Sequence, residues 1–389
     1  MRRRILFVKL GHFSQINDHI SHQINRNFPD HQLTVVDVKD YARRDVFAAA
    51  YNLCAETATF GPSVLRNRGD LHAYFFRTPF MFRRLNRILS RDVARIVPEI
   101  DFVIQTQGLF SARLPGKPLL IYTDYTFLDN LDSSDHDKRL FRSPRFLAYE
   151  AALYRSAEAV ATTGSHVEQT LVTRYGCDPS RVTTIHVGAN ASTAPVATDL
   201  GRYAAKKVVF VGVEWERKGG PALIEGFLQA SRKHQDASLS IIGCSPAVSH
   251  PRITVIGRIP PEDVAQHYAA GSVFCMPSLI EPLGIAAVEA SLSGLPVIAT
   301  KIGGFYESVT HGETGFLVPP NDPAAVGAAL ERLFDAPDLG RRMGLAGCER
   351  NRARFDWNQV GKRLRSIAEV IAPEIREPSG DPMPFPRSG

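Results

Sequence analysis

Two glutamates eight residues apart are the residues best placed for chemistry in this sequence. Glu281 and Glu289 occur in the run PSLIEPLGIAAVEA, which follows an apolar run ending at Met276. The pattern predicts a buried strand, a tight turn and a helix to about residue 293. Unpaired N–H groups at a helix N-terminus bind anions, and Gly284 would let a phosphate approach closely. Ser278, Pro282 and Leu283 belong to the same turn.

The two carboxylates suit a ligand with phosphates in its middle and hydroxyls at both ends. Glu281 is expected at the mouth of the anion site, with Glu289 about 8–12 Å further along the helix at 1.5 Å per residue. Carboxylates accept hydrogen bonds from sugar and ribose hydroxyls. Glu281 could instead merely favour the helix N-terminus. Glu289 stands among small apolar residues, where a charge needs a partner.

A second segment, VVFVGVEWERKG, has another pattern typical of anion binding. It predicts a strand, a turn at Gly212 and a helix that opens with Arg217 and Lys218. A helix N-terminus with two cations beside it would stabilise a diphosphate leaving group. The alternative is an ordinary charged first turn of a surface helix.

The elements that must position these residues read as two doubly wound α/β domains, because short β-branched runs alternate with amphipathic stretches. Strands are expected at Ile5–Leu10, Leu33–Val38, Phe102–Gln105, Leu119–Thr123, Ala159–Thr162, Val182–His186, Lys207–Val211, Leu239–Gly243, Ile253–Ile256, Val273–Met276 and Pro296–Ala299. The predicted divisions are a first domain over 1–190, a linker over 191–204, a second domain over 205–350, a helix over 351–372 that packs back toward the first domain, and a disordered tail over 373–389. Ligands of such folds bind where strand ends meet helix starts.

The composition is that of a globular protein without a membrane-spanning helix or a disulfide framework. The 389 residues are 44% apolar and 22% charged, and there is no run of 18 uncharged apolar residues, so a membrane-spanning helix is not expected. The apolar run after Met1 is short and reads as a first strand, which favours a cytoplasmic location. Five scattered cysteines without a Cys-x-x-Cys pair predict free thiols.

Positive charge is concentrated in residues 64–97. That segment has eight arginines against Asp70 and Asp92, a net +6 that equals the excess of the whole chain. Aromatic and apolar residues are interleaved with them: Tyr74, Phe75, Phe76, Phe80, Met81 and Phe82. Basic residues beside exposed aromatics suit an anionic membrane surface or a lipid-phosphate acceptor. The alternative is a solvated helix face over ordinary core aromatics. Nucleic acid is not an expected partner, since no binding motif accompanies the charge.

The motifs together resemble the GT-B glycosyltransferases of family 4. Glu-x7-Glu after Pro-Ser is followed by GLPVIAT from Gly294, the pair Gly303-Gly304, then Glu307, and GETGFLVP from Gly312. The resemblance is strongest over 205–335, clear over 157–190 and weak over 1–125. It implies retaining transfer from a nucleotide sugar without a metal or other cofactor. By resemblance Glu281 contacts the donor sugar, Glu289 binds the ribose, and Arg258 and Ile259 meet the nucleotide base.

The sequence departs from the family pattern at two places. Val213 stands where an arginine is expected, and Arg217 could supply the lost charge beside Lys218. Asp124 stands where many members have a histidine that faces the donor sugar. It could accept hydrogen bonds from sugar or acceptor hydroxyls, or act as a base.

Two further segments have weaker patterns. Gly11 and His12 follow the first strand and would face the cleft from the acceptor side, although His12 could simply cap a helix. The Asp135-His136-Asp137 run resembles a metal motif of other transferases, but its polar surroundings predict a loop.

The predicted function is a retaining glycosyltransferase that moves a sugar from a nucleotide-diphosphate sugar to a hydroxyl acceptor, either a glycan or a lipid-linked molecule. A role in cell-envelope polysaccharide or glycolipid synthesis, peripheral to the inner face of a membrane, would suit the basic segment. Two alternatives remain open: a nucleotide-sugar epimerase on the same fold, and a non-catalytic GT-B-like binding protein. The donor base, the sugar, the acceptor, the linkage and the oligomeric state are left open.

Overall fold

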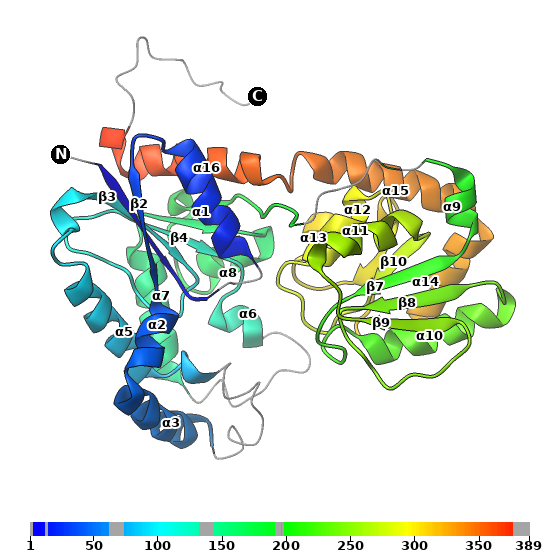
Figure 1. Cartoon of the computed structure of the whole chain (residues 1–389), viewed down its shortest axis with the longest axis horizontal. Helices are drawn as coiled ribbons and strands as arrows, with labels where there is room; N and C mark the ends of the chain where they lie inside the picture. The colour runs from blue at the N-terminus through cyan, green and yellow to red at the C-terminus, as the bar shows by residue number, and fades with distance from the viewer. Residues whose placement is uncertain are drawn as a thin grey trace, which may run out of the picture.

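The computed structural model describes residues 3–11, 15–61, 74–131, 143–190, 196 and 198–375. These residues form two units, each built on a six-stranded parallel sheet (Figure 1). The first sheet has the order β2-β1-β3-β4-β5-β6 and the second the order β12-β11-β10-β7-β8-β9. The strands are β1 (Arg4–Lys9), β2 (Gln32–Asp37), β3 (Ile100–Thr106), β4 (Leu119–Thr123), β5 (Ala159–Thr162), β6 (Val182–Thr184), β7 (Lys207–Val211), β8 (Ser238–Ile242), β9 (Ile253–Gly257), β10 (Val273–Met276), β11 (Val297–Thr300) and β12 (Gly315–Val318).

Helices cover both faces of each sheet, as the crossovers between parallel strands require. In the first unit they are α1 (Ile16–Asn27), α2 (Val38–Arg44), α3 (Val46–Phe60), α5 (Pro79–Asp92), α6 (Phe127–Leu131), α7 (Pro144–Ser156) and α8 (Ser165–Thr173). The others are α9 (Leu200–Ala204), α10 (Gly220–Lys233), α11 (Pro261–Ala270), α12 (Ile285–Leu292), α13 (Phe305–Ser308), α14 (Pro323–Asp335), α15 (Pro337–Arg352) and α16 (Trp357–Ile371). Short 3-10 turns occupy Val97–Glu99, Pro179–Arg181 and Pro373–Ile375.

Strand order fixes where each sheet can hold a ligand. The order reverses between β1 and β3 in the first sheet and between β7 and β10 in the second. Ligands of doubly wound sheets bind beyond the carboxyl ends of the strands at such a reversal. The loops after β7 and β10, which carry Lys218 and Glu281, therefore lie side by side at the reversal in the second sheet.

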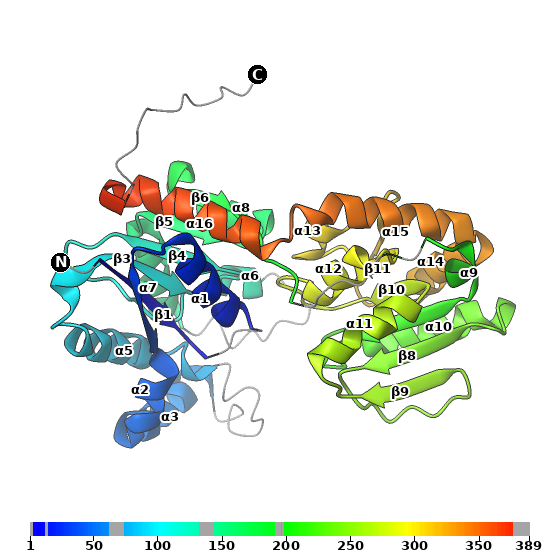
Figure 2. The same cartoon turned by 45° about the horizontal axis from the view of Figure 1, so that its top comes forward.

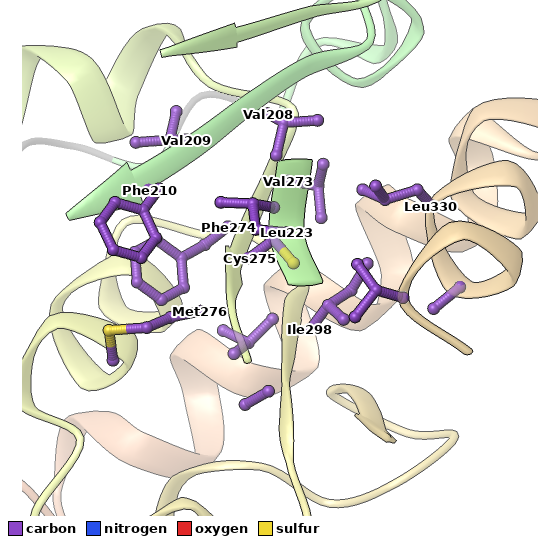
Figure 3. Packing of buried hydrophobic residues seen from close by; sticks show 14 of the residues in the cluster. Val208, Val209, Phe210, Leu223, Val273, Phe274, Cys275, Met276, Ile298 and Leu330 are labelled. Carbon is purple, nitrogen blue, oxygen red and sulfur yellow. The ribbon is translucent and has the colours of Figure 1, made fainter. Parts of the chain in front are cut away.

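The hydrophobic core beneath these loops is fully buried. Figure 3 shows Phe210 of β7 beside Phe274 and Met276 of β10, with Leu223 of α10 and Leu330 of α14 also in the cluster. All five side chains are fully buried. Strands covered on both faces give a rigid base for the loops at their ends.

The chain crosses between the units twice. After α15 in the second unit, α16 returns to the first unit and packs against α1 (Figures 1 and 2). Trp357 at the start of α16 stacks on His19, with ring centroids 4.7 Å apart. The N–H of Ala189 donates to the carbonyl of Phe355 at 3.1 Å, which joins the two crossings.

The eleven predicted strands all occur, with ends that differ by no more than two residues. The strand predicted over Val182–His186 ends at Thr184, and His186 has the positive φ of 62° that breaks the extended backbone. One four-residue strand, β12, was not predicted. The predicted disordered tail is wrong at its start: Pro373–Ile375 forms a 3-10 turn with Ile375 buried, while residues 376–389 lie outside the described part.

The prediction of exposed aromatics within residues 64–97 is wrong in the part that the structure describes. Tyr74, Phe76, Met81 and Phe82 are buried in the core of the first unit. Helix α5 is amphipathic, so its apolar face packs inward while its arginines face solvent. Across the described ranges, no helix is both long and apolar enough to span a membrane.

Candidate active site

A cavity of about 400 Å³ lies where the carboxyl ends of the two sheets face each other. Its lining brings together six residues that the sequence singled out: Asp124, Arg217, Lys218, Glu281, Pro282 and Leu283. Asn190, Ile280 and the first two residues of α12, Ile285 and Ala286, complete it. Because a helix N-terminus carries unpaired N–H groups and a partial positive charge, the start of α12 makes the wall attractive to phosphate.

The loop between β10 and α12 is held in shape by the segment after β11. The N–H of Gly304 donates to the carbonyl of Glu281 at 2.9 Å. A Cβ at Gly303 would overlap that same carbonyl oxygen, so only glycine fits there. Gly284 stands at the N-cap of α12 with a left-handed φ of 68°, which glycine adopts without strain. The Gly-Gly pair and Gly284 therefore fix the position of Glu281.

Glu281 forms a buried ion pair with Lys218. The Lys218 Nζ lies 2.5 Å from Glu281 Oε2, and Glu281 is only 5% exposed. Ser278 donates to the same oxygen at 3.2 Å, and the N–H of Gly284 donates to Oε1 at 3.1 Å. Burial disfavours the charged carboxylate, but Lys218, Arg217 and the Gly284 N–H outweigh it and hold the pKa of Glu281 below its usual value.

Two details differ from the sequence-based expectation. Glu281 was expected at the mouth of the site, whereas it lies buried in the cavity wall because Lys218 draws it inward. The N–H of Gly284 was expected to be free for a phosphate, whereas it donates to Glu281. The ion pair thus occupies the groups that a diphosphate and a sugar hydroxyl would use.

Arg217 lies beside this pair and braces the loop. Its guanidinium donates to the carbonyl of Ile280 at 2.8 Å and pairs with Glu214, three residues earlier. Its own carbonyl accepts from the N–H of Leu279 at 2.8 Å. Val213, where the family has an arginine, is more than half exposed. Arg217 therefore lines the cavity, but it also supports the Glu281 loop.

Glu289 is buried in α12 and has the partners that its surroundings require. The N–H of Asn190 donates to Oε1 at 3.2 Å, and the Tyr268 hydroxyl lies 3.3 Å from Oε2. Asn190 also lines the cavity of about 400 Å³, so Glu289 lies directly behind the wall of that cavity. Sequence reasoning missed Asn190 and Tyr268, since neither stands in a motif.

The remaining predicted residues that the structure describes do not line this cavity. A Cβ at Gly212 would lie 3.1 Å from Lys218 Cγ, so this glycine gives the lysine room. Arg258 and Ile259 follow β9, and Gly11 follows β1, at the same edges of the two sheets. The N–H of Gly11 donates to Asp37 at 3.0 Å. His12 and Asp135–Asp137 lie outside the described residues.

A smaller cavity of about 180 Å³, called the inner cavity below, lies next to the first one and is lined mostly by residues of the first unit. The two cavities share Asp124 and Pro282. The inner one is lined by Arg77, Gln107, Gly108, Leu109, Tyr125, Thr126, Phe127 and Glu150 as well. Its charged groups are one guanidinium and two carboxylates, a combination that can bind several hydroxyls of one molecule.

Both carboxylates of the inner cavity hold their protons unusually strongly. Burial raises the pKa of Asp124 to about 7, and Asp129 adds to the effect while Arg77 opposes it. Burial also raises the pKa of Glu150 to about 7, although the Tyr175 hydroxyl and the N–H of Phe127 donate to it. Shifted carboxyl groups in a cleft are typical of functional sites. The sequence analysis did not single out Glu150. It stands in the helical run YEAAL, and its apolar neighbours could have identified it as a buried charge, as they did for Glu289.

We expect Glu150→Gln to stabilise the protein at high pH. The folded pKa is above the ordinary value of 4.5, so ionising Glu150 costs stability as pH rises from about 4.5 to 7. Glutamine avoids that cost and can still accept from Tyr175. The variant should unfold a few degrees above the wild type at pH 8, and the gain should vanish at pH 4.5. An equal gain at both pH values would contradict the assignment.

Glu307 forms polar contacts that join the two units. Glu307 of α13 accepts from the Ser165 N–H of the first unit at 2.7 Å and from Arg354 Nη2 at 2.7 Å. His186 lies beside this pair, and burial together with Arg354 lowers its pKa to about 4, so it is neutral. Glu307 belongs to a family motif, but its role as a bridge between the units was not predicted from the sequence.

The described residues contain no group of three or more His, Cys, Asp or Glu side chains arranged to hold a metal ion.

Comparisons with known proteins identify the family and the fold. Residues 30–193 match the family model described as Glycosyltransferase Family 4, and residues 205–336 match the model of Glycosyl transferases group 1. A D-inositol 3-phosphate glycosyltransferase of Corynebacterium diphtheriae is 28% identical over 246 residues, covering 56% of this chain and 57% of that protein. A glycogen synthase of Mycobacterium tuberculosis is 27% identical over 243 residues, covering 59% and 58%. The chain thus spans little more than half the length of these relatives.

Solved structures share the whole architecture. A sucrose-phosphate synthase from Thermosynechococcus elongatus superposes with a TM-score of 0.67 at 19% identity, covering 95% of this chain and 99% of that chain. The Anabaena HepE protein in complex with UDP and glucose gives a TM-score of 0.63 at 15% identity, covering 95% and 100%. These likenesses are likenesses of fold.

Proposed function

Since the chain belongs to the family 4 (group 1) glycosyltransferases of the GT-B fold, we propose that it transfers a sugar from a nucleotide-diphosphate sugar to a hydroxyl acceptor with retention of configuration. The observation that carries the proposal is the buried Lys218–Glu281 pair at the N-terminus of α12. It places a cation, a hydroxyl-binding carboxylate and a helix N-terminus in one cavity wall. A diphosphate and the sugar attached to it need those three groups together.

The donor would lie along the wall formed by the β7 and β10 loops. Lys218, Arg217 and the start of α12 would face the diphosphate, and Glu281 would accept from sugar hydroxyls once the phosphate engages Lys218. Glu289 behind Asn190 would hold the ribose, with Arg258 and Ile259 next to the base. HepE, a structural neighbour, is described with UDP and glucose, which supports a nucleotide-sugar donor.

A front-face displacement fits the groups present. The acceptor oxygen would bond to the anomeric carbon from the side on which the bond to the β-phosphate oxygen breaks. The acceptor proton would pass to the departing diphosphate, whose charge Lys218 and Arg217 would neutralise. Glu281 is engaged with Lys218 and is not suited to act as a nucleophile. Closing the cleft would exclude water from this step.

The acceptor would enter from the first unit. The inner cavity meets the donor wall at Asp124 and Pro282, and its carboxylates and Arg77 would bind acceptor hydroxyls. We propose a glycan or lipid-linked acceptor, as in the synthesis of cell-envelope polysaccharide or glycolipid, with the enzyme peripheral to the inner face of a membrane. The net +6 of residues 64–97 supports that location.

A panel of UDP, GDP, ADP and their sugars tests the proposal by thermal shift. We expect one nucleotide series to raise the unfolding temperature by several degrees, because a ligand at about 100 times its Kd adds about 2.7 kcal/mol. No shift with any of them would favour a non-catalytic binding protein. Conversion of the bound nucleotide sugar into its epimer without an acceptor would instead identify an epimerase.

A further inference from the structure

The solvent face of α3 is apolar and uncharged along its whole length. Phe47 is 91% exposed, Val46 69% and Tyr51 61%. The exposed residues follow helical spacing and form one stripe: Val46, Phe47, Ala50, Tyr51, Leu53, Cys54 and Ala58. The one charged residue of α3, Glu56, is buried on the opposite side. A contiguous apolar face of this kind marks a binding surface.

Neighbouring helices surround this face with positive charge. Residues 38–61 and 74–97 hold nine basic residues against four acidic ones. Glu56 is buried and Arg77 lines the inner cavity, so eight basic residues and three acidic ones are left. Arg43 and Arg44 end α2 and are exposed just before Phe47. On α5 the exposed Arg83, Arg87 and Arg91 are spaced four apart and line a single shallow hollow. Figures 1 and 2 show α2, α3 and α5 together on the lower side of the first unit.

Specific contacts hold these helices as one rigid platform. Asp45 caps α3 by accepting from the Ala48 N–H at 3.0 Å and pairs with Arg84 of α5. The Tyr51 ring packs on Phe80 at the start of α5, with centroids 4.5 Å apart. Asn52 donates to the carbonyl of Phe75 at 2.8 Å. These contacts fix the apolar stripe of α3 against α2 and the start of α5, while Arg83 of α5 lies over the Tyr149 ring of α7.

We propose that the α3 stripe docks on a bilayer containing anionic lipids, with Phe47 and Tyr51 entering the interface and the arginines of α2 and α5 contacting headgroups. An apolar stripe flanked by basic residues and lying flat on its domain is the pattern of an interfacial helix. The alternative occupant, a second copy of this chain, would bring two positively charged rims face to face across a two-fold axis. Charge complementarity thus favours anionic lipid. This surface differs from the buried aromatics of residues 74–82 that the sequence suggested.

Vesicle sedimentation of the full chain tests the proposal without donor or acceptor, so it is independent of the proposed transferase activity. We expect binding to phosphatidylcholine vesicles that contain phosphatidylglycerol and little binding to phosphatidylcholine alone. Phe47→Ser with Tyr51→Ser should abolish it. Reversing Arg87 and Arg91 to glutamate should weaken it about tenfold or more, at about 1 kcal/mol per basic residue.

Matched controls lie elsewhere on the molecule. Val370 on α16 is 69% exposed, and Arg232 on α10 is exposed, so Val370→Ser and Arg232→Glu should leave vesicle binding unchanged. In Phe47→Trp, the new tryptophan should shift its emission to the blue on anionic vesicles. Vesicle binding that survives the Phe47 and Tyr51 changes would overturn the proposal. So would a solution dimer that those changes convert to a monomer while wild-type vesicle binding is absent.

Discussion

Lys218→Met is expected to abolish transfer while leaving the fold in place. Lys218 is the cation nearest Glu281, and the proposed mechanism depends on it to neutralise the departing diphosphate. Removing one preorganised donor of this kind costs about 10²–10³ in kcat. Steady-state nucleotide release with and without acceptor measures the loss. A variant that keeps more than about a tenth of the wild-type kcat would contradict the role of Lys218.

The same change should destabilise the protein in a way that depends on pH. In the wild type the pKa of Glu281 is depressed, so the ion pair stabilises the fold above pH 4.5 and the contribution is lost as pH falls through the folded pKa. In Lys218→Met the main group that opposes burial is lost, so the pKa of Glu281 rises and the cost grows with pH. Breaking a buried pair in this way costs up to about 3–5 kcal/mol at neutral pH. The deficit should shrink as pH falls below 4.5.

Two further variants separate catalysis from stability. Lys218→Met with Glu281→Gln removes both charges, so the free energy of unfolding should recover while activity stays lost. Lys233→Met removes an exposed lysine of α10 that pairs with Asp335, and it should change neither property appreciably. Full recovery of activity in the double variant would show that the pair is merely structural.

The sequence predicted the candidate site residues of the second unit better than those of the first, and the reason is physical. In the second unit, short and largely apolar strands alternate with glycine turns, and the residues proposed to contact phosphate lie within single loops such as 276–285. Local spacing is then enough to predict their chemistry. Lys218 and Glu281 come from two loops, but each stands in its own motif. Their pairing with each other, however, depends on the order of β7 and β10 in the sheet.

The inner cavity shows why the rest could not be predicted. Arg77 precedes α5, Asp124 follows β4 and Glu150 lies on α7, so these residues come from three distant parts of the chain that only the folded structure brings to one cavity. No sequence spacing relates them. The sequence likewise did not indicate which aromatic residues near the arginines of α5 are buried. Aromatic, basic and turn residues are mixed from Tyr74 to Phe82, so no helical periodicity is visible there. The uncharged face of α3 is evident only once the buried side of that helix is known.

Asp124→Asn is expected to remove a pH dependence as well as activity. The carboxyl of Asp124 lies where the donor and inner cavities meet, and its pKa is raised to about 7, chiefly by burial. The ionised form accepts a hydroxyl hydrogen bond better than the acid form does. The wild-type kcat/KM should therefore rise with pH and level off above about 7. In Asp124→Asn it should be flat across that range and lower by about 10²–10⁴.

Glu150→Gln is the matched control for that assignment, because Glu150 lines the same cavity and its pKa is also about 7. Asp124, Glu150, Asp129 and Arg77 interact, so the observed inflection belongs to the cluster and the variants must apportion it. An inflection near pH 7 that persists in Glu150→Gln and disappears in Asp124→Asn supports Asp124 as the group that meets the reacting hydroxyl. The reverse pattern would assign that role to Glu150 and leave Asp124 as a structural acid. Retention of the inflection in both variants would exclude the inner cavity from the chemical step.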